Sequence, residues 1–156
     1  EGGGCECGVG LVPNGFGVNI RFGVRVVTSN DVGAVGNGGS VNTLAERWNC
    51  TAWNIVPTPS FNSNATNEVL VGIVALSSDS VWTAGQYIVP LEGSAQHTLT
   101  ENWDGSNWNF VPSPDRNHSN NRLHGITVTA NGTLWSVGTL GVFGKPERTL
   151  IQRKTP

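Results

Sequence analysis

The sequence predicts an all-β repeat protein made of about three four-stranded antiparallel sheets. A pair of Trp residues recurs in ERWNCTAWNIVPTP (46–59) and ENWDGSNWNFVPSP (101–114). A block that closes on Gly occurs three times, as FGVRVVTSNDVGAVG (22–36), VGIVALSSDSVWTAG (71–85) and HGITVTANGTLWSVG (124–138). No segment sustains a period of 3.6 residues, so we expect no helix of useful length.

The Gly-closing block predicts two strands joined by a tight turn. Val71, Ile73 and Ala75 alternate with other residues, as expected for a strand with one face buried. SSDS (77–80) and ANGT (130–133) have turn composition, and Asn-Gly is the strongest hairpin signal. The second strand then runs to the closing glycine of each copy, which is Gly36, Gly85 or Gly138.

A third strand and a fourth complete the predicted unit. The third carries Thr-Leu, at Thr43-Leu44, Thr98-Leu99 and Thr149-Leu150. Trp103 and Trp108 flank the turn DGSN (104–107), so we expect them to face each other across a hairpin. Pro112 follows and ends the fourth strand, because proline cannot donate to a ladder inside a sheet.

Four-stranded antiparallel sheets that recur about every 50 residues are typical of β-propeller blades. The pattern D-V-x-A-V-G (31–36), followed by T-L-x-E-x-W and W-x-x-V-P-(S/T)-P, resembles the Trp-rich β-propeller repeats of secreted bacterial proteins, which are related to kelch-like and lectin-like propellers. The resemblance covers residues 22–154 and implies propeller-like blades used for binding or scaffolding. Two positions depart from it: Gly33 stands where the other copies have Trp, and Cys50 stands where copy two has Gly105.

The chain is therefore expected to form one domain over residues 1–156. Its parts are an N-terminal strand segment (1–21), blade 1 (22–69), blade 2 (70–121) and an incomplete blade 3 (122–156). We interpret the six Trp residues as blade-core packing, with a sugar-stacking platform as the alternative; they are Trp48, Trp53, Trp82, Trp103, Trp108 and Trp135.

The two ends of the chain match each other in pattern. The third copy has no W-x-x-V-P strand, and GVGLVPNG (8–15) resembles the end of one. We expect this segment to complete the third blade of a neighbouring subunit, because an open sheet edge readily pairs with another chain. The assembly strand would contain Val9, Leu11, Val12 and Pro13, and the partner edge would contain Leu150 and Gln152. The result would be a ring or a filament; the alternative is that the chain is an excerpt of a longer propeller.

Composition excludes several classes of function. Only 13% of the 156 residues are charged and the net charge is -2, so no basic patch suggests nucleic acid. No apolar stretch is long enough to span a bilayer. The N-terminus does not resemble a signal peptide and lacks Met, so we take the chain to be a processed or truncated product. Abundant Gly, Asn, Ser and Thr favour an extracellular protein or one on the cell surface.

No residue pattern predicts catalysis, a metal or a cofactor. The odd cysteine count, with Cys5, Cys7 and Cys50, leaves a free thiol or one that pairs across subunits, and we favour inert or disulfide-bonded cysteines. None of the three histidines (His97, His118 and His124) has a partner at ligand or triad spacing. We therefore expect a non-enzymatic protein.

Glu46, Glu101 and Gln152 occupy one position of the repeat. A carboxylate that an amide can replace indicates a structural hydrogen-bond acceptor; the alternative is a pair of glycosidase carboxylates. Asp31 and Asp79 occupy a hairpin turn, and we interpret both as ordinary turn formers.

Asn64 and Asn117 lie in polar loops after Pro-x-Pro and are the best candidate glycan acceptors among four sequons. Asn49 and Asn131 lie in tight turns and are weaker candidates. We expect the protein to bind other copies of itself, and its loops to be free for further contacts. The alternative is a lectin-like propeller that binds glycans on its Trp residues.

Overall fold

The computed structural model describes residues 19–39, 42–59, 66–90, 93–116, 120–142 and 144–156. These residues form eleven strands and no α-helix, which confirms the predicted all-β class. Within these ranges there is accordingly no apolar helix long enough to cross a membrane. Several predicted sites lie outside the described residues; they are Val9, Leu11, Val12, Pro13, Asn64, Asn117, Cys5, Cys7 and His118.

The strands form three antiparallel sheets, each made from consecutive strands. The first sheet contains β1 (Ile20–Thr28), β2 (Asp31–Gly38), β3 (Asn42–Trp48) and β4 (Trp53–Ile55). The second contains β5 (Thr66–Ser77), β6 (Ser80–Val89), β7 (Ala95–Trp103) and β8 (Trp108–Phe110). The third contains β9 (Asn120–Val128), β10 (Leu134–Gly141) and β11 (Arg148–Lys154), in the order β11-β10-β9. The first strand of each sheet begins two to four residues before the predicted boundary of its unit.

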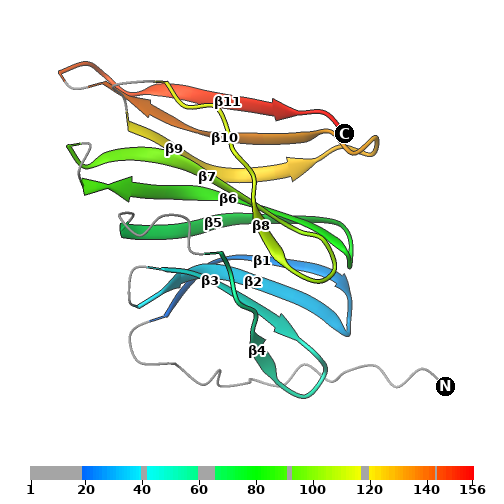
Figure 1. The fold of residues 1–156 in the computed structure, drawn as a ribbon. Helices are drawn as coiled ribbons and strands as arrows, with labels where there is room; N and C mark the ends of the chain where they lie inside the picture. The colour runs from blue at the N-terminus through cyan, green and yellow to red at the C-terminus, as the bar shows by residue number, and fades with distance from the viewer. Residues whose placement is uncertain (1–18, 40–41, 60–65, 91–92, 117–119, 143) are drawn as a thin grey trace.

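The three sheets are stacked in chain order, with the second between the other two (Figure 1). Val35 and Ala45 of the first sheet form a buried core with Leu70 and Leu99 of the second. We call the face of a sheet that points along the stack toward the next sheet its forward face, and the opposite face its rear face. The forward face of one sheet therefore packs on the rear face of the next.

The repeated closing glycines are required by a close backbone approach. A Cβ atom on Gly36, Gly85 or Gly138 would lie 1.8, 1.9 and 1.8 Å from a carbonyl oxygen of the neighbouring first strand. Only glycine fits at such a distance. Each first strand also has an irregular residue near this point, at Phe22, Val71 and His124 respectively, where the pairing register shifts by one.

The Trp pairs lie across their hairpins as predicted. Trp48 pairs with Trp53 and Trp103 pairs with Trp108, with ring centroids 5.9 and 5.8 Å apart. These four side chains and Trp82 are half-buried, whereas the most deeply buried apolar side chains belong to Leu and Val. Trp135 differs from the predicted packing role because its side chain is 37% exposed. It lies on the forward face of the third sheet, on which no further described sheet packs.

Candidate functional site

The outer edge of the third sheet is the clearest difference between the three repeats. In the first two sheets the third strand pairs on its outer side with a short fourth strand, β4 or β8. In the third sheet β11 pairs with β10 and with no other described strand. The backbone N–H and C=O groups of residues 148–154 that point outward therefore offer a template for another strand.

A cavity of about 300 Å³ lies beside this edge, between the second and third sheets. The matching space between the first and second sheets is only about 20 Å³, and Trp103 and Trp108 line it. Lys154 has the register position of Trp103, since each pairs with the first apolar residue of the preceding strand. The larger cavity is therefore where a fourth strand would place its side chain. It is lined by Trp82, Thr100, Val111, Pro112, Ser113, Pro114, Ile126, Leu134, Ser136, Gln152, Arg153, Lys154 and Thr155.

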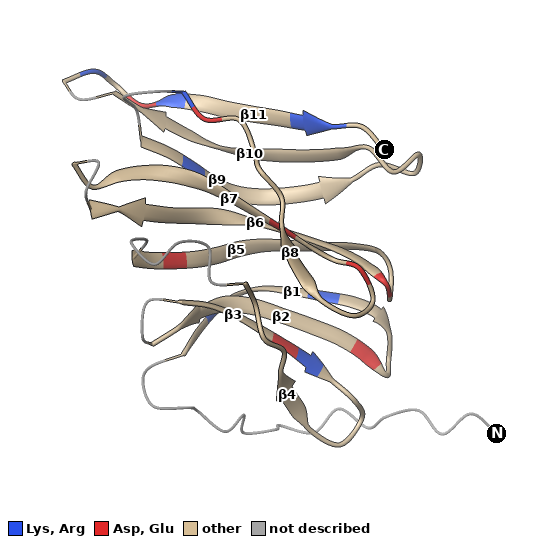
Figure 2. Ribbon diagram, viewed as in Figure 1, with Lys and Arg blue, Asp and Glu red and all other residues tan. Residues whose placement is uncertain are grey.

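Cationic side chains cover the aromatic rings near this edge. Lys154 Nζ lies 5.5 Å from the centroid of the Trp82 ring, and Arg153 Cζ lies 5.9 Å from that of Trp135. Figure 2 shows basic residues at both ends of β11, which begins at Arg148 and ends with Arg153 and Lys154. The edge is therefore basic, and it favours a partner segment that is neutral or acidic.

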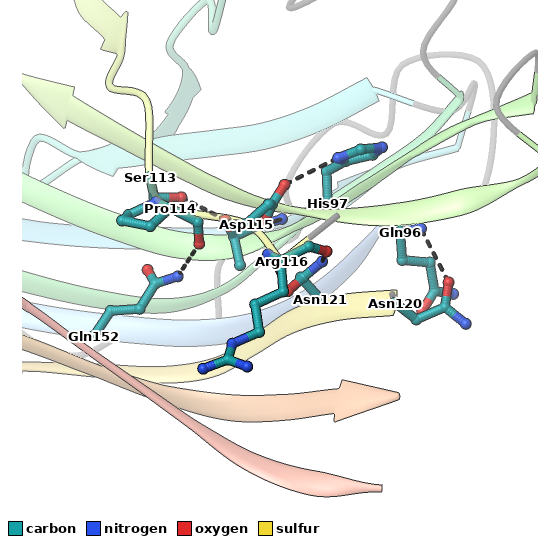
Figure 3. Close-up of polar contacts among 10 residues, drawn as sticks. Gln96, His97, Ser113, Pro114, Asp115, Arg116, Asn120, Asn121 and Gln152 are labelled. Carbon is teal, nitrogen blue, oxygen red and sulfur yellow. Dashed lines mark hydrogen bonds and ion pairs between the residues drawn. The ribbon is translucent and has the colours of Figure 1, made fainter. Parts of the chain in front are cut away.

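The two predicted partner-edge residues are both half-buried. Gln152 donates a hydrogen bond from Nε2 to the carbonyl oxygen of Pro114, 2.6 Å away (Figure 3). Its side chain thus points to the second sheet and fixes the segment that follows β8. Leu150 pairs with Gly138 on β10, as Leu99 pairs with Gly85 in the second sheet.

A threonine on the third strand of each sheet also distinguishes the third sheet from the first two. Thr43 Oγ1 donates to Thr58 Oγ1 at 2.7 Å, and Thr98 Oγ1 lies 2.6 Å from Ser113 Oγ. In both pairs the partner is the residue after the proline that ends the fourth strand. Thr149 has the equivalent position in the third sheet and is exposed, whereas Thr43 and Thr98 are buried.

His97 has an acidic partner that the sequence analysis missed. Its Nδ1 lies 2.9 Å from Asp115 Oδ2. Figure 3 marks this contact with a dashed line. The His97 ring also stacks on Tyr87. Asp115 Oδ1 accepts hydrogen bonds from the backbone N–H and the hydroxyl of Thr98, at 3.0 and 2.7 Å. The hydroxyl of Ser113 contacts Thr98 rather than His97, so the group does not have the geometry of a Ser-His-Asp triad. It attaches the segment after β8 to β7.

The two glutamates of the repeated position are buried in different surroundings. Glu46 receives hydrogen bonds from Arg21 Nε and Nη2, at 2.5 and 2.8 Å. Burial, and after it the nearby Glu68 carboxylate, raise the pKa of Glu101 to about 8, against the opposing effect of a hydrogen bond with Thr43. The structure therefore gives Glu46 and Glu101 different partners and does not assemble them as a glycosidase pair.

Asp31 has a larger role than the predicted one of a turn former. It is buried and ion-paired with both Arg25 and Arg47. Asp79 is exposed, in keeping with a turn residue. In the part of the chain that the structure describes, no group of three His, Cys, Asp or Glu could hold a metal ion.

Cys50 is disulfide-bonded. It has a φ of 75°, close to the 95° of Gly105 at the same point of the second sheet. Cys50 therefore keeps the backbone conformation that the repeat has at this turn. Its positive φ costs some strain, because only glycine adopts such angles freely.

Comparison with known proteins provides no further information on this site: no protein-family model matches the chain, and no curated protein is similar to it.

Proposed function

We propose that this protein is a non-enzymatic, extracellular structural protein of propeller-like blades whose copies associate head to tail. The N-terminal strand of one copy completes the third sheet of the next copy by pairing with β11. One observation carries this proposal. The outer edge of β11 pairs with no described strand, whereas the equivalent strands β3 and β7 each pair with a fourth strand, β4 or β8.

The repeats supply a register for the added strand. Trp103 pairs with Trp108 and Glu101 with Phe110, and Val111 N donates to Thr100 O at 2.9 Å. The first sheet repeats this geometry, with Val56 N donating to Ala45 O at 2.8 Å. By the same spacing Val9 would pair with Lys154 and Leu11 with Gln152, and Val12 N would donate to Ile151 O. The side chain of Val9 would then enter the cavity beside Lys154.

Connection lengths and charge also support strand donation. Nine residues separate β8 from β9 and ten separate β4 from β5. Eight residues separate Leu11 from Ile20, where β1 begins, so the added strand could lead into β1 by a similar loop. The donor segment contains Glu1 and Glu6 and no basic residue before Arg21, which complements the basic β11. Asn14 would lie opposite Thr149, in the place of Ser113.

Two observations favour the extracellular and non-enzymatic parts of the proposal. The disulfide at Cys50 is typical of an oxidising compartment. The polar network at His97 is used to hold the backbone of the segment after β8, which is a structural task.

Removing residues 1–15 tests the proposal. We expect the full chain to assemble and the truncated chain to be a folded monomer, as measured by sedimentation and circular dichroism. A synthetic peptide of residues 8–15 should then bind the truncated chain. The matched control is the same peptide with Val12→Pro, which keeps an apolar side chain but removes the N–H that would donate to Ile151 O.

Unchanged assembly after truncation would contradict strand donation. A full chain that stays monomeric at all concentrations would instead favour the alternative in which this sequence is an excerpt of a longer propeller. Binding of both peptides with equal affinity would show that the peptide does not pair with the β11 edge.

Carbohydrate binding is a second candidate function, which the cavity beside Trp82 favours. An indole ring and polar side chains such as Thr100, Ser136 and Gln152 line this cavity, and such a set suits the apolar face and hydroxyls of a sugar. A glycan array should then give binding that Trp82→Ala abolishes. Displacement of the glycan by the 8–15 peptide would show that both occupy one cavity.

A further inference from the structure

The outward faces of the first and third sheets have the features of two halves of one interface. We propose that the forward face of the third sheet binds the rear face of the first sheet in a second copy. This inference rests on the proposed head-to-tail association, and it adds to the donated strand a second, face-to-face contact with its own residues.

The two interfaces inside the molecule follow a common pattern. A Cβ atom on Gly23 of the first sheet would lie 2.8 Å from Val71 O of the second sheet. A Cβ atom on Gly72, its equivalent in the second sheet, would lie 3.0 Å from Ile126 N of the third. Each forward face thus presents a glycine against the first strand of the next sheet, and the lack of a side chain permits the close approach.

Apolar residues surround this glycine on the forward face. Gly23 pairs with Val35, which pairs with Ala45, and both apolar residues are buried against Leu70 and Leu99 of the second sheet. The register positions of Val35 and Ala45 correspond to those of Val137 and Ile151 in the third sheet. The third sheet therefore repeats the forward-face pattern of the first.

The forward face of the third sheet is exposed. Among the residues that the structure describes, the only heavy atom within 4 Å of a Cβ placed on Gly125 is Val137 Cγ2, of the same sheet, at 3.7 Å. Val137 and Ile151 are 48% and 59% exposed, and Trp135 lies beside them on the same face at 37%. This row of apolar side chains corresponds to Val35 and Ala45 of the first sheet, which are buried against the second sheet.

The rear face of the first sheet has a complementary character. Val24 and Val26 on β1 are 66% and 68% exposed, and Ile55 on β4 is 51% exposed. Val24 has the register position of Ile73, which packs against Gly33 in the first internal interface. Phe22, at the irregular position of β1, is the equivalent of Val71, whose carbonyl meets Gly23. It would therefore meet Gly125 of the other copy.

These observations specify a second copy as the partner, because the two faces belong to the same repeat. Within the chain, a forward face already packs on a rear face twice, each time with a glycine against the first strand of the next sheet. The contact joins different surfaces on the two partners, so it is heterologous and can continue from copy to copy. The donated strand and the stacked faces are also compatible. Within the molecule a fourth strand leads directly into the first strand of the next stacked sheet, as β8 leads into β9 (Figure 1).

Two sets of charge substitutions test the inference. One variant carries Val137→Glu and Ile151→Glu on the forward face, and the other carries Val24→Glu and Val26→Glu on the rear face. Each should be a monomer at concentrations where the wild type assembles, with the dissociation constant raised about tenfold or more. Leu76→Glu is the matched control: Leu76 is 46% exposed but lies on β5 of the middle sheet, and this substitution should leave assembly unchanged.

Mixing the two variants gives the decisive measurement. Each retains one intact face, so an equimolar mixture should form a single heterodimer and nothing larger, as measured by sedimentation. Gly125→Ala is an independent variant for the case in which a charged variant does not fold, and it should also weaken assembly.

Three outcomes would overturn the inference. The first is wild-type assembly in both variants, the second is dimerisation of either variant alone, and the third is a mixture that stays monomeric. If truncation of residues 1–15 abolishes assembly while the face variants assemble normally, the donated strand stands and the face contact fails. The reverse result would leave the face contact and remove the strand.

Discussion

Arg25 Nη2 lies 3.1 Å from Asp31 Oδ1, and both side chains are buried between the first and second sheets. A Cβ atom on Gly33 would approach Arg25 Nε to 3.0 Å. The Arg25 side chain thus takes the space that an indole ring occupies in the other two sheets. This contact explains why Gly33 departs from the repeat.

Removal of either partner of this ion pair should destabilise the protein. We expect Arg25→Val and Asp31→Asn each to lower the free energy of unfolding by about 2–4 kcal/mol. The first leaves the buried Asp31 carboxylate ion-paired with Arg47 alone, and the second leaves the buried Arg25 guanidinium without an opposite charge. The double substitution should cost less than the sum of the two, because the residues share one network. Urea unfolding of the three variants measures this coupling, and strictly additive effects would show that the pair contributes no interaction of its own.

The buried Glu101 should make stability depend on pH. Its pKa is raised to about 8 in the folded protein, first by burial and then by Glu68. A carboxyl group with a raised pKa holds its proton more tightly in the folded state than in the unfolded state. Its contribution to stability is therefore complete below about pH 4.5, falls as the pH rises and is lost once the pH passes about 8.

Glu101→Gln should remove this dependence. The variant should exceed the wild type in stability by an amount that grows between pH 4.5 and 8 and reaches a few kcal/mol. Thermal unfolding across this range measures the difference, with Glu147→Gln as a control because Glu147 is an exposed glutamate. A constant difference between Glu101→Gln and the wild type at all these pH values would mean that Glu101 does not titrate in this range.

The repeat made the sheets predictable from the sequence. Alternating apolar residues and turn composition located the first two strands of each sheet, and the Trp pairs located the hairpins of β3 with β4 and of β7 with β8. The closing glycines could be recognised because a close backbone approach admits no other residue there. They do not end the second strands as predicted, because these strands run two to four residues further, to Gly38, Val89 and Gly141. The stacking of one sheet on the next did not follow from strand patterns, because it depends on contacts between faces.

The polar contacts were less predictable because they join residues far apart in the chain. His97 and Asp115 are separated by 18 positions and by a whole hairpin, and the buried Asp31 is ion-paired with both Arg25 and Arg47. The exposure of Trp135 also depends on tertiary structure, since its neighbours in sequence resemble those of the half-buried Trp82. A repeated residue type therefore predicts a strand position but not the partner across the interface.

Two equivalent glycines should respond differently to the same substitution. Gly72→Ala places a Cβ atom 3.0 Å from Ile126 N and 3.2 Å from Gly125 Cα, and neither backbone atom can move without shifting the third sheet. We expect a loss of about 1–3 kcal/mol of stability. In the described part of the chain Gly125→Ala meets only Val137 Cγ2, at 3.7 Å, so the isolated molecule should keep its stability.

Thermal unfolding of the two alanine variants at low protein concentration measures this contrast. Equal destabilisation would mean that some other packing partner covers Gly125 as closely as the third sheet covers Gly72. Sedimentation at high concentration adds a second readout, in which Gly125→Ala should assemble more weakly than the wild type.

The ion pair on the rear face of the first sheet provides the last prediction. Arg21 stands at the position of the buried leucines Leu70 and Leu123, and it covers the Glu46 carboxylate, whose side chain has no exposed surface. Arg21→Leu alone should destabilise the fold by about 2 kcal/mol, because it leaves that carboxylate buried without its partner. Arg21→Leu with Glu46→Gln should recover most of this loss, since the two positions then match Leu123 and Gln152 of the third sheet.

The double variant also presents more apolar surface to a second copy, so it should assemble at lower concentration than the wild type. Thermal unfolding together with sedimentation measures both effects, and a double variant that is stable but assembles less well would show that the charged pair itself contributes to the contact.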